Sequence, residues 1–237
     1  MLVLIVLPAA FWIWIVAMAR DMYGPMTGAS AWMMTGRWDL PHVLLLWAMW
    51  AAMMAAMMLP SAAPLLLVFS RRAARTSTAA TTIYALAAGY LVVWTAFSLG
   101  ATLLQRLLAV RLVISPMMET TTPIASAAIL LVAGIYQWAP LKQACLRSCR
   151  SPMDFLMSRW RPGLAGAFRL GASHGVYCVG CCWALMLLLF VGGVMNLATI
   201  AALTVVVAIE KIVPFSAGSS RLLGVLLVIV AISLLLA

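Results

Sequence analysis

The chain has 237 residues, of which 66% are hydrophobic and only 8% are charged. A soluble globular domain has about 45–50% apolar and about 25% charged residues, so this composition excludes an ordinary soluble domain and indicates an integral membrane protein in contact with a lipid bilayer. The net charge of +10 comes from basic residues spread over short loops. Such residues are typical of topology signals and lipid contacts, so we predict no binding of nucleic acid.

Apolar runs separated by Pro, Gly and Arg predict an all-α fold, a polytopic bundle of transmembrane helices. At roughly 30 residues for each span and its loop, the length predicts about seven helices, or six, in one membrane domain covering residues 1–237. The first twenty residues lack a basic n-region and a cleavage site, so we interpret them as a retained first helix. The predicted spans are residues 2–19, 42–70, 79–107, 124–139, 163–191, 195–213 and 221–236.

The basic residues of the loops predict the orientation of the bundle. They gather in the second, fourth and sixth loops, whereas the fifth loop, "VGGVMN", has no charge. We therefore expect a bacterial inner-membrane protein with a cytoplasmic N-terminus and an external C-terminus. The basic residues of the three cytoplasmic loops are Arg71, Arg72, Arg75, Lys142, Arg147, Arg150, Arg159, Arg161, Lys211 and Arg221.

The second predicted span, "WAMWAAMMAAMMLPSAAP", is rich in methionine. Met49, Met53 and Met57 recur every four residues and so share one face of a helix. A thioether is a soft, uncharged ligand that selects Cu(I) over Zn(II), and it can lie in hydrocarbon at little cost. The alternative is that these side chains only fill irregular gaps between helices.

The loop "YQWAPLKQACLRSCRSP" contains two cysteines in a basic setting. Pro140 breaks the preceding helix, and Cys145 and Cys149 lie one turn apart if the helix resumes. Because thiols on the cytoplasmic side face a reducing compartment, they do not form a structural disulfide. They are an entry or exit site for a thiophilic metal, a redox pair, or ordinary free thiols in a lipid-contacting loop.

The fifth predicted span contains "GASHGVYCVGCCWALM", with a histidine and three of the five cysteines. At about 100° per residue, His174, Cys178 and Cys181 fall within an arc of about 60°, with Cys182 at its margin. Imidazole and thiolate together suit Zn(II), Cu(I) and iron–sulfur clusters. Ionisable groups at this depth of a membrane helix indicate a functional site.

The alternative for this span is close packing. Free cysteine behaves as a small buried hydrophobe, and small residues line the contacts between membrane helices. Gly171 and Gly175 are four residues apart and predict the close approach of another helix.

Glu210 and Lys211 end the sixth predicted span, just before Pro214. Because adjacent residues do not share one helix face, Glu210 is expected to contact another helix or a cation. The alternative is that the pair only anchors the end of the helix.

Four motifs in this order, "MMAAMMLPSAAP", "YQWAPLKQACLRSC", "GASHGVYCVGCCWALM" and the "EK" before Pro214, resemble the bacterial family of predicted metal-binding integral membrane proteins, domain of unknown function family 2182. The resemblance runs from about Met49 to Pro214. At Ala139 the chain departs from the family, which commonly has threonine there. The resemblance implies metal binding by Met49, Met53, Met57, Cys145, Cys149, His174, Cys178, Cys181, Cys182 and Glu210.

The leading prediction is an inner-membrane protein that binds a soft transition metal, Cu(I) in the first place and Zn(II) in the second. It would transport the ion or deliver it to a periplasmic or membrane metalloprotein or chaperone. His174, Cys178 and Cys181 would form the core site, the methionines a relay, and the cysteines of the fourth loop a cytoplasmic acceptor. The sequence has no P-loop, so it would not hydrolyse ATP.

Two other functions stay open at this point. One is a membrane thiol–disulfide oxidoreductase that exchanges electrons between the pairs Cys145/Cys149 and Cys178/Cys181. Burial raises the pKa of a thiol and slows exchange, which disfavours this function, and we expect a protein without enzymatic activity. The other is a structural subunit of a membrane complex, in which the cysteines only pack.

Overall fold

The computed structural model describes the chain except residues 1, 35–37, 74–77, 213–215 and 237, so Arg75 and Pro214 lie outside the described part. The predicted all-α fold is confirmed: the described residues form eleven helices, and their β-structure is a single isolated bridge in the loop after α4. Seven helices occupy the seven predicted segments, namely α1 (Leu2–Met22), α3 (Leu40–Ala73), α4 (Ala79–Val110), α5 (Pro123–Tyr136), α8 (Gly163–Met186), α10 (Leu197–Ile212) and α11 (Ser216–Leu236). The four shorter helices are α2 (Ala29–Met33), α6 (Pro140–Arg150), α7 (Pro152–Arg159) and α9 (Leu189–Gly192).

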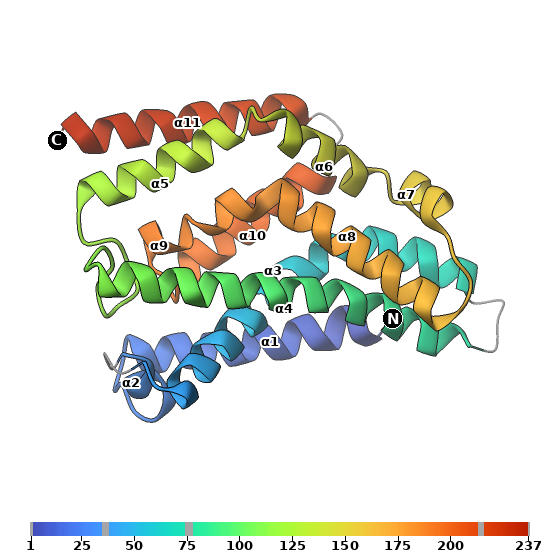
Figure 1. Ribbon diagram of the computed structural model, residues 1–237, viewed down its shortest axis with the longest axis horizontal. Helices are drawn as coiled ribbons and strands as arrows, with labels where there is room; N and C mark the ends of the chain where they lie inside the picture. The colour runs from blue at the N-terminus through green and yellow to red at the C-terminus, as the bar shows by residue number, and fades with distance from the viewer. Residues whose placement is uncertain (1, 35–37, 74–77, 213–215, 237) are drawn as a thin grey trace.

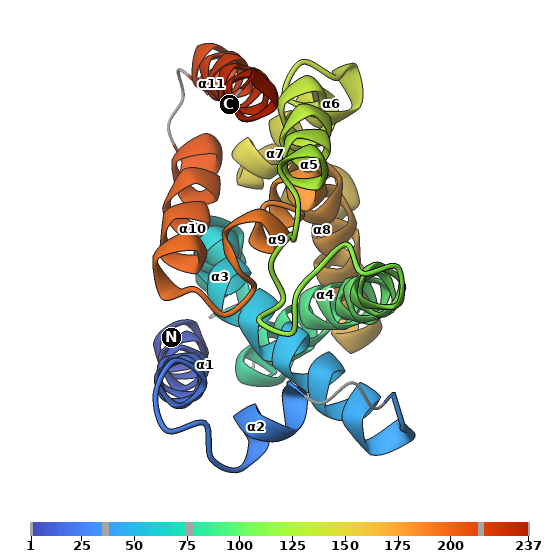
Figure 2. The same cartoon turned by 90° about the vertical axis from the view of Figure 1, so that its left-hand side faces the viewer.

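These seven helices run back and forth between two ends of the bundle (Figure 1). One end, here called the α2 end, contains α2 and the loop that follows α4. The other, called the α7 end, contains α7 and the turn into α8. Viewed from the α2 end, α5 and α11 lie on the same side of the molecule as α6, away from α1 and α2 (Figure 2). The alternating directions agree with the alternating loops on which the predicted orientation depends.

The predicted number of spans is higher than the structure supports. Four described segments are long and apolar enough to cross a membrane: Leu40–Ala73, Ala79–Val110, Gly163–Gly192 and Gly218–Leu236. A fifth is added if α5 and α6, which meet at a bend of 63°, form one broken span. The difference from seven arises in part from helix length, because α5 has 14 residues and α10 has 16. At about 1.5 Å per residue they fall short of a hydrocarbon core of about 30 Å.

Helix α3 lies at the centre of the packing and contacts α1, α4, α7 and α10. Its methionines are buried, as are Trp50 and Phe69 on the same helix. A helix that buries side chains on most of its circumference has to be apolar all round, which is what the second predicted span shows. Helix α3 therefore holds the other elements in place around the cysteine-bearing α8.

The contact between α4 and α8 depends on glycine. A Cβ atom on Gly171 would overlap the carbonyl oxygen of Leu86, and one on Gly89 would overlap the carbonyl oxygen of Phe168. A Cβ on Gly175 would lie 2.9 Å from the Cβ of Val93. The predicted close approach of a helix to Gly171 and Gly175 is confirmed, and the helix is α4.

We predict that Gly171→Ala destabilises the protein. The new methyl group meets backbone rather than a flexible side chain, so α4 has to move, at a cost of about 1–3 kcal/mol. Thermal unfolding in detergent should show a lower melting temperature. Gly100→Ala on α4 is the control, because its Cβ would have no neighbour within 4 Å. Equal melting temperatures for the two variants would contradict this packing.

Candidate functional site

The five cysteines are all free and buried, and the fold brings residues from both predicted groups together. Helix α6 packs on α8 and brings the side chain of Cys149 next to that of Cys181. The sulfur of Cys145 lies 2.7 Å from the place where Gly180 would carry a Cβ, so a larger residue would not fit there. The core site and the cytoplasmic acceptor, which the sequence predicts separately, are therefore neighbours in a single cysteine cluster.

Cys178 is the member of the cluster with the most polar partners. The Nζ atom of Lys211 lies 2.8 Å from its sulfur, and the hydroxyl of Tyr90 lies 3.0 Å from it. Lys211 also donates to the hydroxyl of Ser61 at 2.9 Å, and Tyr90 donates to the carbonyl of Met58 at 2.9 Å. Groups from α4 and α10 thus contact the sulfur of Cys178 on α8, α3 holds both of them, and a lysine places a positive charge beside the sulfur.

The thiols of the other two cysteines of α8, Cys181 and Cys182, hydrogen-bond to the backbone of their own helix. The thiols of Cys181 and Cys182 donate to the backbone carbonyl of Cys178 at 3.1 and 2.9 Å. The three cysteines of α8 therefore lie within about one turn of each other, and each is at most 1% exposed.

His174 lies one turn from Cys178 but is surrounded by aromatic rings. Its ring centroid is 5.8 Å from that of Tyr90 and 5.3 Å from that of Phe155. Its Nδ1 atom is buried and has no hydrogen-bond partner. Among the described residues, no group of three or more His, Cys, Asp or Glu side chains could hold a metal ion. Metal ligation by His174 and by the other predicted residues stays a prediction.

Glu210 forms a buried ion pair with Lys142 of α6. The Nζ atom of Lys142 donates to both carboxylate oxygens at 2.9 and 2.8 Å, and Ser220 donates to one of them at 2.8 Å. Arg150 of α6 donates to the backbone carbonyl of Glu210 at 2.8 Å. The expected contact of Glu210 with another helix is confirmed. Because Lys211 follows directly, the same turn of α10 directs one residue to α6 and the next to Cys178.

The predicted methionines form a continuous buried stripe on α3. Met49, Met53 and Met57 are each at most 1% exposed. Successive members are four residues, or about 6 Å, apart along the helix axis. The stripe leads from the neighbourhood of Met58 and Tyr90, beside the cysteine cluster, towards the α2 end.

Sequence reasoning missed several polar residues of this site. Tyr90 and Ser61 are buried polar groups in largely apolar helices, and a polar group at such depth is itself a signal of function. Lys142 and Lys211 were interpreted from sequence as loop charges that set the topology. Both are buried, and Lys142 is completely so.

The family model of PpoB2, described as a copper chaperone, matches residues 47–234. The match begins just before the methionine stripe, ends in α11, and includes all ten predicted site residues. It supports the copper-related part of the resemblance drawn from the motifs. No curated protein and no solved structure matches the chain.

We predict that Glu210→Gln and Lys142→Met each destabilise the protein by about 3–5 kcal/mol, because each leaves the other charge buried and unpaired. Chemical denaturation in detergent measures the loss of unfolding free energy. The double variant should lose less than the sum of the two single variants, because it leaves neither charge behind. Asp154→Asn on α7 is the control. Additive effects would show that the pair is not coupled.

Proposed function

We propose, since the chain belongs to the PpoB2 copper chaperone family, that it binds Cu(I) as cargo inside a membrane and delivers it to a metalloprotein partner. The observation that carries this proposal is the contact between Cys149 of α6 and Cys181 of α8 beside Cys178. The two thiols come from different helices and are both buried. If these side chains only filled space, alanine or valine would pack there equally well.

The donor set fits Cu(I) better than Zn(II). Thiolate and thioether ligands are soft and select Cu(I). Cu(I) is satisfied by two thiolates, whereas structural Zn(II) is held by four ligands. The described part of the chain brings no three His, Cys, Asp or Glu side chains together as a metal site. An ion with a low coordination number is therefore the natural cargo of this cluster.

The charges of the site also fit a bis-thiolate complex. Cu(I) bound by two thiolates has a net charge of −1, which is costly to bury without compensation. The ammonium group of Lys211, 2.8 Å from the sulfur of Cys178, supplies one positive charge. Glu210 is already neutralised by Lys142 and does not cancel it. Because Arg150 of α6 also lies near Cys149 and Cys181, the loaded site would have no uncompensated negative charge.

Location in a membrane is supported by the surface of the bundle. Large apolar side chains are exposed along α4 and α11, among them Leu103, Leu107, Leu226 and Ile229. An exposed apolar surface of this extent requires lipid or a partner protein to cover it. Arg72, Arg159 and other basic residues lie at the α7 end, which the positive-inside rule assigns to the cytoplasm. The α2 end would then face outwards.

We predict that Cys149→Ser/Cys181→Ser weakens Cu(I) binding at least tenfold, because oxygen is a poor ligand for this soft ion. The measurement is competition with a chromophoric Cu(I) chelator on anaerobically purified protein, with metal content by mass spectrometry. Ser148→Ala, one residue before Cys149 on α6, is the control, since its hydroxyl bonds to the carbonyl of Ala144 in its own helix and lies outside the cysteine cluster. An unchanged affinity in the double variant, or wild-type protein that binds no Cu(I), would refute the proposed site.

We predict that Lys211→Met also weakens Cu(I) binding, by about tenfold, which corresponds to about 1.4 kcal/mol. The reason is that the anionic complex loses its compensating charge. The same chelator competition measures the effect, and Arg221→Met on α11 is the control for the loss of a basic residue. Tighter binding in Lys211→Met would instead show that the ammonium group competes with the ion for Cys178.

A further inference from the structure

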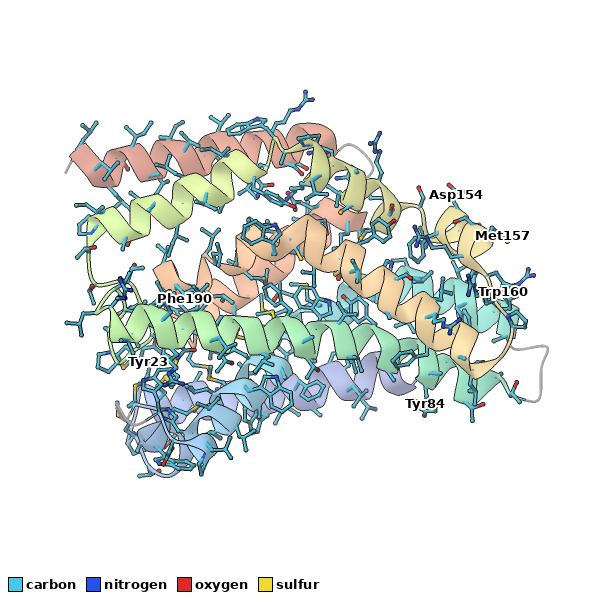
Figure 3. The ribbon with its side chains drawn as sticks, in the orientation of Figure 1. Tyr23, Tyr84, Asp154, Met157, Trp160 and Phe190 are labelled. Carbon is cyan, nitrogen blue, oxygen red and sulfur yellow. The ribbon has the colours of Figure 1, made fainter. Side chains whose placement is uncertain are left out.

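A cavity of about 380 Å³ opens at the α2 end, far from the cysteine cluster along α3. It is enclosed by the end of α2, the first turns of α3, the end of α4 and the loop of residues 111–122. Figure 3 shows the two ends of the molecule, with Tyr23 on the side of the α2 end and Asp154, Met157 and Trp160 at the α7 end. The lining residues with soft or aromatic side chains are Met33, Met34, Met118, His42 and Trp38.

The lining of this cavity has the chemistry of a soft-metal site. Three thioethers come from two segments that are far apart in the sequence, and an imidazole from α3 joins them. Among the described residues that line the cavity there is no carboxylate, the ligand that Mg²⁺ and Ca²⁺ require. Trp38 adds an aromatic ring, whose face attracts cations. Thioether, imidazole and indole together favour Cu(I) or Ag(I).

The backbone of the loop supports a specific role for Met118. Met118 has a φ of 61° and Leu112 a φ of 57°, and both residues line the cavity. Left-handed backbone is uncommon for residues other than glycine, and each such residue costs of order 1–3 kcal/mol. Hydrogen bonds from Met118 N to Ser115 O and from Thr120 N to Phe190 O hold the loop in this shape. The fold thus retains strain that brings the Met118 side chain to the cavity.

Methionine is also frequent at the α2 end, outside α3. Six of the 17 methionines belong to residues 20–40 and 111–122, the two connecting segments at this end. Three of the six, Met22, Met33 and Met118, are buried against the core, and Met33 and Met118 also line the cavity. The fold therefore holds these two side chains in place beside the cavity.

The cavity and the methionine stripe lie along the same helix, α3, whose His42 and Leu46 line the cavity. His42 lies on the first turn of α3, and Met49 follows about two turns later on the same helix. From Met49 the stripe continues through Met53 and Met57 to the cysteine cluster. We propose that this cavity is a second Cu(I) site, built from Met33, Met34, Met118 and His42, through which cargo enters or leaves at the α2 end. The identity of the cargo rests on the proposed function.

The test uses the full chain with all five cysteines changed to serine, so that no thiol remains. Titration with Ag(I), and with Cu(I) under anaerobic conditions, should show one bound equivalent. X-ray absorption at the copper edge should show sulfur and nitrogen ligands. Adding Met33→Leu/Met34→Leu/Met118→Leu should weaken this binding at least tenfold. Adding Met153→Leu/Met157→Leu, two exposed methionines of α7, should leave it unchanged.

The outcomes separate this inference from the proposed function. If the cysteine-free protein binds no Ag(I) or Cu(I) while the wild type does, the thioether site is refuted and the cysteine site stands. If both bind one equivalent, and the methionine variant removes it in both, the thioether site stands and the cysteine site falls. Should the cysteine-free chain not fold, as judged by circular dichroism, the methionine variant is made in the wild type. There the stoichiometry should fall from two to one, and no change would refute the site.

Discussion

The buried ion pair between Lys142 and Glu210 is the interaction on which the geometry of the cysteine cluster depends. It ties α6 to α10 in a place where an unpaired charge would be prohibitive. The tie has two consequences at once. It holds Cys149, which is two turns after Lys142 on α6, against α8. It also fixes the turn of α10 whose next residue, Lys211, reaches Cys178. An apolar contact between α6 and α10 would be less directional. It would therefore not fix the positions of Cys149 and Lys211.

The site combines soft ligands with few fixed charges, and this combination suits a low-dielectric interior. A carboxylate cluster would bind cations but would require several buried negative charges, each costing several kcal/mol. Thioethers need no compensation, and a pair of thiolates that bound Cu(I) would need one positive charge. In the proposed site that charge would come from Lys211. The hydroxyl of Tyr90 hydrogen-bonds to the sulfur of Cys178, and the hydroxyl of Ser61 accepts from the ammonium group of Lys211. These bonds satisfy the thiol and the ammonium group, which would otherwise be costly to bury.

The sequence predicted the parts of this structure that are local and missed those that depend on how helices meet. Periodicity and apolar runs predicted the positions of the seven helices that run between the two ends. Gly171 and Gly175 predicted the close approach of another helix, which the structure identifies as α4. Pro140 predicted a break, but not the direction of the 63° bend that follows α5. That bend lays α6 on α8 and joins two groups of cysteines that the sequence keeps apart. Lys142 shows the same limit, because a basic residue between two spans is typical of a solvated loop. Only its pairing with Glu210, 68 residues away, explains its burial.

A carrier of copper has to release its cargo as well as bind it, and this requirement gives a physical reason for donors of two kinds. Paired thiolates hold Cu(I) tightly, so direct release into water would be slow. Neutral thioethers hold it more weakly and at a strength that does not depend on protonation, since methionine does not titrate. In the proposed relay, a stripe of thioethers from Met57 to Met49 would divide one large step into several small ligand exchanges. The cavity around Met118 would place weaker binding at the α2 end, where a partner with stronger ligands would take the ion.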